Sequence, residues 1–246
     1  MIHKDQPTCF GTSLLVGVSS VADGTMLDRS YGTTEQPTKV MMNRKRLCLA
    51  IGNPYENTVY QQIRYAENLS YDKIVDVTEA DTTSRREAVH ADALYTEEPH
   101  VGLFLPVADC IATVFYDPVR RALCVAHLGR HSTVANLADK VVKHFVEKGT
   151  RPEDLIIWLS PHVSREQYVL DFFNPENESA WKAYTVQRKG KVYVDLEGFN
   201  IAAVVRAGVE RRNIHVSDTC TFTSPDYFSH SNGDTLGRFA IVASIA

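Results

Sequence analysis

Residues 107–132 read VADCIATVFYDPVRRALCVAHLGRHS. This stretch holds two apolar segments of strand character, Ile111–Tyr116 and Ala122–His127, which are joined through a turn-like Asp-Pro dipeptide. Cys110 precedes the first segment and His127 closes the second, so folding can bring a thiol and an imidazole together. Functional groups tend to collect where strands end, and we therefore expect the chemistry of the protein here.

The pair of Cys110 and His127 is compatible with two kinds of chemistry. A thiolate and an imidazole are ligands that zinc and copper prefer, whereas a thiol beside an imidazole can act as a nucleophile with its general base. Cys124 takes part in neither, because side chains alternate faces along a strand and a residue three positions from His127 points to the opposite face. We expect Cys124 in the hydrophobic core.

The composition indicates an ordinary globular protein. Of the 246 residues, 44% are hydrophobic, and no linker rich in proline, glycine or serine divides the sequence, so we expect one domain spanning residues 1–246. A formal net charge of -4 with interspersed signs gives no electrostatic footprint for nucleic acid or for an anionic membrane. Small molecules are the expected partners, and the sequence indicates no particular oligomeric state.

Targeting signals are not evident, and the cysteine pattern suits a reducing compartment. No apolar run approaches the ~20 residues that cross a bilayer, and Met1–Phe10 lacks the charged and then apolar pattern of a signal peptide. The cysteines are odd in number and show no CxxC spacing, which argues against a disulfide framework. We expect a cytoplasmic protein with five reduced thiols, at Cys9, Cys48, Cys110, Cys124 and Cys220.

Strand-like segments alternate with helical patterns along the rest of the chain, which predicts a mixed α and β fold. The clearest helix is Ser132–Lys148, where apolar residues share one face and Gly149 supplies the stop signal. Further helices are expected at Thr38–Ile51 and Leu196–Ala207, and a polar loop at Asp81–Val89. Further strands are expected at Leu14–Val21, Lys73–Thr78, Val101–Val107, Leu155–Leu159 and Phe239–Ile245.

A set of short motifs, in a fixed order along most of the chain, resembles one known family. The motifs are NRKRL (43–47), HADALYT (90–96), VADC (107–110), VAHLG (125–129), WLSPHV (158–163), VDL (194–196), DTCT (218–221), FS (228–229) and GR (237–238). Each is weak by itself, but the ordered set is specific. The chain resembles the laccase-domain family, also called the YfiH-like or multi-copper polyphenol oxidase family, whose members are described mainly as zinc-dependent purine nucleoside phosphorylases with adenosine deaminase side activity.

The resemblance implies a fold, substrates and a metal. The fold would be a single α/β domain with αββα layers and mixed β-sheets, and the active site would lie between the ends of central strands. The substrates would be a purine nucleoside and phosphate, and the metal would be zinc. Copper is the weaker alternative, because a blue-copper site usually adds a methionine ligand and no methionine lies near the candidate ligands in the sequence.

The family's site uses two histidines and a cysteine, on motifs similar to QVHG, ADC and AHAGWRG. The second and third motifs correspond to Cys110 and His127, which the resemblance therefore implies as catalytic residues and metal ligands. Counting back without gaps from HADALYT, Ser70 stands where the first histidine is expected. A catalytic zinc needs about three protein ligands, so the candidates for the third are His131, His90 and Ser70 acting through a water.

Other positions depart from the family's pattern. GRHS replaces GWRG, which puts Arg130 and His131 where a tryptophan and an arginine stand, and FSHSN replaces FSYRR near the end of the chain. Arginine binds phosphate through two parallel hydrogen bonds, so the loss of two arginines weakens the phosphorylase interpretation. Arg44 and Arg238 are the best remaining anion contacts. Asp109, next to the thiol, is either a turn or cap residue or a base.

Three hypotheses of function follow. The favoured one is a zinc enzyme that acts on purine nucleosides by phosphorolysis, with adenosine deamination as a second activity. The second is a metal-free hydrolase in which Cys110 is the nucleophile and His127 the base. The third is a catalytically silent relative that binds a ligand or a partner, which Ser70 and the missing arginines would explain.

Overall fold

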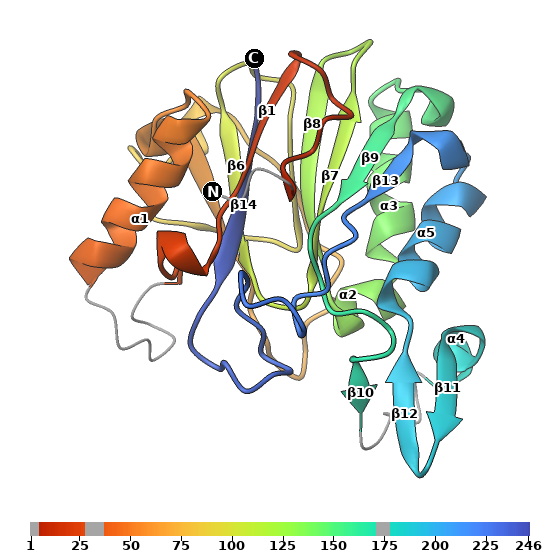
Figure 1. The fold of residues 1–246 in the computed structure, drawn as a ribbon. Helices are drawn as coiled ribbons and strands as arrows, with labels where there is room; N and C mark the ends of the chain where they lie inside the picture. Colours follow the sequence, from red (N-terminus) through yellow and green to blue (C-terminus); the bar gives the residue numbers. More distant parts are fainter. Residues whose placement is uncertain (1–4, 28–36, 171–177) are drawn as a thin grey trace.

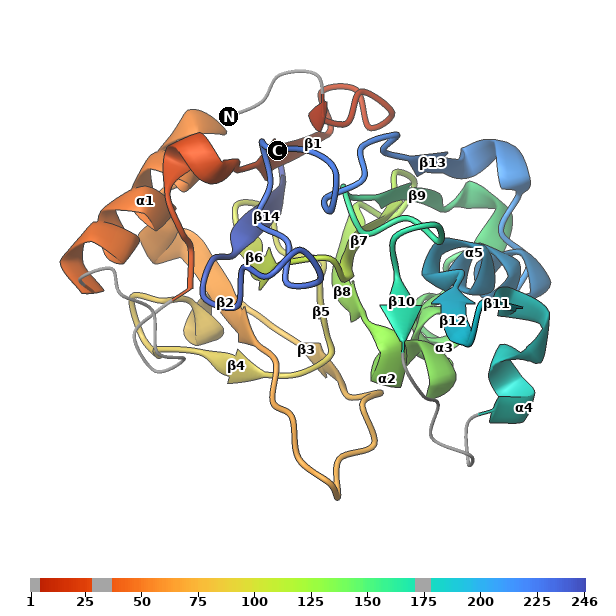
Figure 2. The same cartoon turned by 60° about the horizontal axis from the view of Figure 1, so that its bottom comes forward.

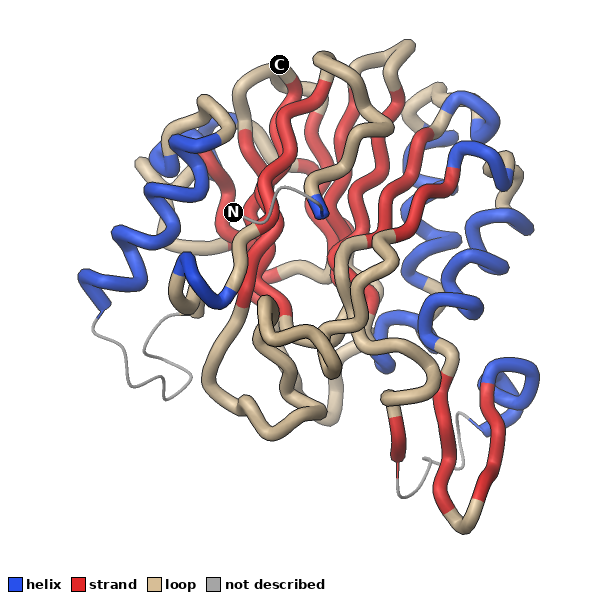
Figure 3. Tube along the Cα trace, in the orientation of Figure 1, coloured by secondary structure: helices blue, strands red, loops and turns tan. Residues whose placement is uncertain are grey.

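The computed structural model describes residues 5–27, 37–170 and 178–246. Two β-sheets pack face to face, and helices cover their outer faces (Figure 1). Helix α1 (Pro37–Ala50) lies against one sheet, and helices α3 (Leu137–Glu147) and α5 (Leu196–Arg206) lie against the other, as the tube in Figure 3 also shows. This arrangement confirms the αββα-layered α/β fold expected from the sequence.

Both large sheets mix parallel and antiparallel pairs. Within the described residues, the five-stranded sheet has the order β1 (Leu14–Val18), β14 (Phe239–Ile245), β6 (Gly102–Val107), β2 (Thr58–Gln62) and β4 (Val89–His90). The six-stranded sheet has the order β13 (Ile214–Val216), β9 (Ile156–Leu159), β7 (Ile111–Asp117), β8 (Ala122–Leu128), β5 (Ala93–Thr96) and β3 (Ile74–Asp76).

A smaller sheet stands apart from these two, next to the short helix α4 (Glu178–Trp181) (Figure 1). Its three strands have the order β10 (Val169–Leu170), β12 (Lys191–Val194) and β11 (Thr185–Arg188). The sequence analysis did not predict this sheet, because its strands are short and carry polar residues among the apolar ones.

Alternating side chains on the central strands explain how the layers pack. On β7, Val114 belongs to the core between the two sheets, and its neighbour Phe115 belongs to the core under α3 and α5. On β8, Val125 belongs to the core between the sheets and Cys124 to the core under α3 and α5. Cys124 is completely buried, as expected from the sequence. A third core lies under α1, where Leu47, Cys48, Phe104 and Val242 meet.

The helix expected at Ser132–Lys148 is two helices, α2 (Arg130–Val134) and α3 (Leu137–Glu147). Asn136 separates them with a φ of 58°, in the left-handed region that ends a right-handed helix. The apolar periodicity crosses this break because it records which positions are buried, and it carries no information on whether the backbone is continuous. None of the described helices combines the length and the apolar composition that a bilayer crossing requires.

The strand ends that carry the candidate residues meet at one edge of the two sheets. The parallel strands β2 and β6 both end there, and β14 begins there because it runs antiparallel to β6, with Phe239 opposite Val107. In the other sheet β7 begins and β8 ends at the same edge, with Ala112 opposite His127. Figure 2, which brings this edge forward, shows the connecting segments gathered around it.

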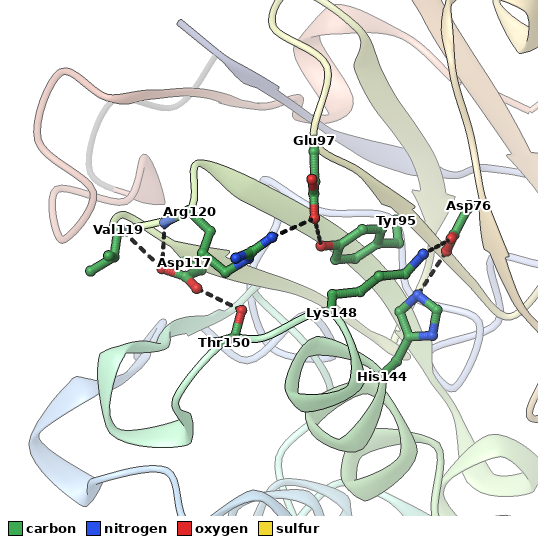
Figure 4. A network of polar contacts seen from close by, with 9 residues as sticks. All are labelled: Asp76, Tyr95, Glu97, Asp117, Val119, Arg120, His144, Lys148 and Thr150. Carbon is green, nitrogen blue, oxygen red and sulfur yellow. Dashed lines mark hydrogen bonds and ion pairs between the residues drawn. The ribbon is translucent and has the colours of Figure 1, made fainter.

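A network of polar contacts links the six-stranded sheet to α3 (Figure 4). Asp76 at the end of β3 accepts hydrogen bonds from Lys148 and from His144, the latter at 2.7 Å. The buried carboxylate of Asp117 accepts from Thr150 at 2.6 Å and from the backbone N–H of Val119 at 2.8 Å. These contacts close the β7–β8 turn and fix α3 against the sheet.

The Asp76 contacts predict a pH-dependent stability. Burial acts to raise the pKa of Asp76, but the hydrogen bond from Lys148 and the charge of His144 outweigh it and hold the pKa below its ordinary value. A lowered carboxyl pKa stabilises the fold above about pH 4, and this stabilisation is lost as the pH falls through the pKa of the folded state. We expect Asp76→Asn to lower the free energy of unfolding at pH 7 by up to about 1 kcal/mol, because the pair is partly exposed. Urea denaturation should show this difference shrinking toward pH 3; a difference that stays constant with pH would contradict the assignment.

Candidate active site

A cavity of about 890 Å³ opens at the edge where the strand ends meet. Its lining comes from Leu27, from the end of β2 and the loop after it, from the end of β6 with residues 108–110, from the end of β8 with α2, from residues 167–170, from Lys191 and from the segment before β14. Cys110 and His127 both line it. The structure therefore brings together the two residues on which the sequence analysis placed the chemistry.

The register of β7 and β8 explains why these two side chains meet. Ala112 pairs with His127 and Ile111 with Leu128, so Cys110 reaches the level of Gly129. A Cβ atom built on Gly129 would lie 2.9 Å from Cys110 Sγ and 3.0 Å from His127 Cε1. The sulfur and the imidazole are therefore close neighbours, and both pack against the bare backbone of Gly129.

Both members of the pair are held in their neutral forms. Burial, and then the negative charge of Asp109, raises the pKa of the Cys110 thiol to about 12. Burial, and then the positive charge of Arg238, lowers the pKa of His127 to about 4. At neutral pH the pair is a thiol and an uncharged imidazole, which disfavours the activated cysteine nucleophile of the second hypothesis.

Asp109 is a turn residue whose carboxylate is already bound. Its φ of 70° lies in the left-handed region, and its carboxylate accepts hydrogen bonds from Thr221 Oγ1 and from the N–H of Ser231, both at 2.6 Å. Its carbonyl also accepts from the N–H of Val163. Of the two roles left open by the sequence, the geometry favours the turn and cap role, in which Asp109 fixes the loops around Cys110.

The cavity carries uncompensated positive charge. Arg130, Lys191 and Arg238 line it, and Asp109 is the one carboxylate among the described lining residues. The guanidinium of Arg130 forms no hydrogen bond or ion pair with any other described residue. Within the described ranges, the guanidinium of Arg238 donates to the carbonyl oxygens of Gly237 and Thr235 and to no carboxylate. An anionic ligand fits this environment.

Aromatic rings line the cavity on the side of α2 and of the loop after β2. Tyr71 stacks on His131 with 4.6 Å between ring centroids and 21° between planes, and Tyr65 lies beside both. Sequence reasoning identified His131 but missed Tyr65, Tyr71 and Lys191. No family motif covers these three positions. The sequence feature that could have indicated a binding surface was the pair of tyrosines in a polar stretch, but the strand before it, β2, was not predicted either.

Arg44, expected to contact the substrate anion, lies outside this cavity. It is buried on α1, where its guanidinium donates to the carbonyl of Met26 at 2.9 Å and to the hydroxyls of Tyr55 and Tyr60. The same group packs 4.1 Å from the Tyr60 ring centroid. These contacts correct the expectation: Arg44 secures α1 to the five-stranded sheet.

Ser70 and His90 are likewise not brought to the Cys110 and His127 pair. Ser70 is exposed and does not line the cavity, because β2 ends at Gln62 and the residues directly after it, Ile63 and Tyr65, reach the cavity instead. The ungapped count from HADALYT therefore placed the motif too late in the chain. His90 lies on β4 in a separate cavity, with Nε2 2.5 Å from the guanidinium of Arg64.

The residues at the cavity do not fit the zinc centre that the resemblance implies. Cys110 and His127 supply two donors of the right kind, but a catalytic zinc takes about three protein ligands. His131 lines the cavity with its ring stacked on Tyr71. In the part of the chain that the structure describes, no group of three or more His, Cys, Asp and Glu side chains is placed to hold a metal ion. A blue-copper site needs a second histidine and usually a methionine as well, and no methionine is among the described residues that line the cavity.

Comparisons with known proteins agree with this fold. The model of the family described as multi-copper polyphenol oxidoreductase laccase matches residues 9–246. The chain belongs to this family. The name of the family refers to copper. In this member, the described cavity residues Cys110 and His127 supply only two donors for a metal.

Among curated relatives of this family member, purine nucleoside phosphorylase YlmD of Bacillus subtilis is 31% identical over 186 residues, which cover 71% of the chain and 67% of YlmD. A purine nucleoside phosphorylase of Xylella fastidiosa is 30% identical over 218 residues, covering 86% and 80%. In the structure of YlmD from Geobacillus stearothermophilus the fold is the same, with a TM-score of 0.84 at 23% identity and coverage of 97% and 94%.

The close packing around Gly129 predicts the effect of adding one methyl group. We expect Gly129→Ala to push the Cys110 sulfur and the His127 ring apart and to cost ~1–3 kcal/mol of stability, as overpacked buried sites do. Thermal unfolding measures the stability, and the His127 ring signals in NMR spectra report the displacement. Unchanged unfolding together with unchanged ring signals would contradict the close contact.

Proposed function

We propose that the protein binds a purine nucleoside and phosphate in the cavity beside Cys110 and His127 and catalyses phosphorolysis of the nucleoside. The observation that carries the proposal is the charge of the cavity, where Arg130 and Arg238 have no carboxylate partner among the described residues. The relatives named purine nucleoside phosphorylase supply the class of substrate.

The reaction requires that two substrates be held in line. An oxygen of hydrogenphosphate forms a bond to C1′ of the ribose as the bond from C1′ to the purine nitrogen breaks, and the departing base takes the electron pair together with the proton that the phosphate gives up. The products are ribose 1-phosphate and the free base. Arginine side chains suit the phosphate because they bind and orient it through paired hydrogen bonds.

Cys110 and His127 contact the nucleoside at the bond that breaks. The un-ionised thiol can donate a weak hydrogen bond and the uncharged imidazole can accept one, so the pair orients the ribose and its leaving base between the arginines and the aromatic rings. No step is assigned to a metal, because the described residues offer two donors there.

A second candidate function is binding of the nucleoside without turnover. The observation that favours it is the state of Asp109, the carboxylate next to the pair, which is occupied by Thr221 and Ser231 and is therefore not placed as a general acid or base. Adenosine deamination meets the same difficulty, since it needs a group that activates water.

The arginine assignment predicts a selective kinetic effect. We expect Arg238→Ala to raise the KM for phosphate at least about tenfold, the effect of losing one charge-assisted contact, with a smaller change in the KM for inosine. Release of hypoxanthine from inosine at varied phosphate measures both constants, and conversion of adenosine to inosine in a parallel assay reports deamination. Arg188→Ala is the matched control: its guanidinium lies over the Tyr193 ring, and Arg188 is not among the residues that line the cavity.

Two outcomes decide between the candidates. Phosphate-dependent release of the base that is weakened in Arg238→Ala supports phosphorolysis. Binding of inosine with no release of base at any phosphate concentration contradicts phosphorolysis and leaves the second candidate.

The donor set also predicts the metal content. Because two protein ligands hold zinc less firmly than three, we expect the purified protein to contain well below one equivalent of zinc, and Cys110→Ala to contain the same small amount. Elemental analysis of both proteins after dialysis measures this. One full equivalent of zinc that is lost in Cys110→Ala would show that a third ligand completes the site.

A further inference from the structure

A second cavity, of about 960 Å³, lies among α1, β2 and the loop before β4. Its lining comes from the N-terminal part of α1, from Tyr55, from β2 with Arg64 after it, from residues 83–88 and from His90. It adjoins the candidate active site, because Tyr60 and Gln62 line both cavities. Its volume falls within the range of cavities that hold small organic molecules, about 300–1,000 Å³, and the proposed function makes no use of it.

The second cavity gathers positive charge. Arg64, Arg85 and Arg86 line it, as does the buried Arg44 described above. Among the described lining residues, Glu87 is the one carboxylate. Like charges that lie near one another repel, and a concave surface lined by one sign of charge attracts ions of the other sign. The second cavity is therefore suited to an anion.

The contact between Arg64 and His90 shows how strong this positive environment is. Nη2 of Arg64 lies 2.5 Å from Nε2 of His90. A guanidinium can only donate hydrogen bonds, so Nε2 accepts and the imidazole is uncharged. Burial, and then the positive charge of Arg64, lowers the pKa of His90, and Lys73 and Arg86 act in the same direction. Arg64 has no carboxylate partner among the described residues, and its charge is available to a ligand.

Arg85 and Arg86 can exchange their present partners for a ligand. Arg85 pairs with Glu79 at 3.3 Å and Arg86 with Asp81 at 2.8 Å, and the two arginine side chains are 60% and 48% exposed. Exposed ion pairs of this kind contribute about 0–1 kcal/mol. An arginine binds a phosphate group more firmly, through two parallel charge-assisted hydrogen bonds.

The loop that carries these two arginines is fixed to the segment before β2 and to its first residue. The N–H of Thr83 donates to the carbonyl of Thr58 at 2.7 Å, and the N–H of Ser84 donates to the carbonyl of Glu56 at 3.2 Å. A loop that is already ordered loses little conformational freedom when a ligand binds. The arginines are thus held beside the cavity in advance of binding.

We propose that the second cavity binds a ligand with two adjacent phosphate groups, and that Arg64, Arg85 and Arg86 are its phosphate contacts. A single phosphate group carries at most about two negative charges, fewer than the arginines that line the cavity. A diphosphate brings more charge and more acceptor oxygens, so that each guanidinium can form paired hydrogen bonds. This site is separate from the proposed phosphorolysis and does not rest on it.

The apolar part of the lining bears on the source of the diphosphate. Pro37, Val40 and Met41 of α1 line the second cavity, and the Met41 side chain is 37% exposed. Pyrophosphate makes no use of these side chains, whereas the organic portion of a nucleoside diphosphate can cover them. Both ligands share the chemistry that the arginines recognise, and the experiment distinguishes them.

Titration calorimetry with pyrophosphate, ADP and AMP at low ionic strength tests the site. We expect the wild type to bind pyrophosphate and ADP more tightly than AMP, and added salt to weaken binding. Arg64→Ala and Arg86→Ala should each weaken pyrophosphate and ADP by about tenfold or more, the effect of losing one charge-assisted contact. Tighter binding of ADP than of pyrophosphate that is lost in Met41→Ser identifies an organic diphosphate; equal binding of the two identifies a free polyphosphate.

Two further variants control for charge and for the neighbouring cavity. Arg46 is an exposed arginine on α1 that lines neither cavity, so Arg46→Ala removes the same charge and should bind every ligand as the wild type does. Arg238→Ala changes the candidate active site and should retain pyrophosphate binding in the second cavity. Thermal unfolding of each variant confirms that it is folded.

Three results contradict the inference. The wild type could bind neither pyrophosphate nor ADP, or Arg64→Ala and Arg86→Ala could bind both as tightly as the wild type. Loss of pyrophosphate binding in Arg238→Ala with full retention in Arg64→Ala would place the anion in the candidate active site instead. None of these results affects the proposed function, which is tested by the kinetics of phosphorolysis.

Discussion

The antiparallel pairing of β7 with β8 is the constraint on which the rest of the site depends. Its register sets Ala112 against His127 and so carries Cys110 to the level of Gly129. A slip of one residue would turn every side chain of a strand to the opposite face and would separate the two groups. Both strands are buried along their whole length between two hydrophobic cores, so the register that orders the core also places Cys110 beside His127.

The sequence was a good guide to several of the longer buried elements, although it did not predict the buried strands β2 and β5. Phe239–Ile245 is a strand over its expected residues and α1 begins within one residue of its expected start, because alternating or helical apolar patterns record which faces are covered. The proximity of Cys110 and His127 was predictable for the same reason, since it follows from where the two central apolar segments begin and end. The division at Asn136 was missed because a single left-handed residue leaves the apolar pattern intact.

The residues that the sequence placed differently from the structure depend on loop lengths or on contacts between distant segments. Ser70 was located by counting residues, but the loop after β2 puts Tyr65 at the cavity and leaves Ser70 exposed. Arg44 carries a charge in a family-like motif, yet its guanidinium is used between α1 and the sheet. The sequence shows that a residue is charged and that it belongs to a motif. Which groups it contacts depends on segments that are distant in sequence.

The cavity is lined by segments from widely separated parts of the chain, from Leu27 to Arg238 just before the last strand. No contiguous fragment of the chain contains more than a part of this surface, and its complete form needs the pairing of β14 with β6. A ligand that requires all of them has negligible affinity for partly folded chains. Its binding would therefore shift the folding equilibrium toward the completed protein, by an amount that grows with the logarithm of its concentration.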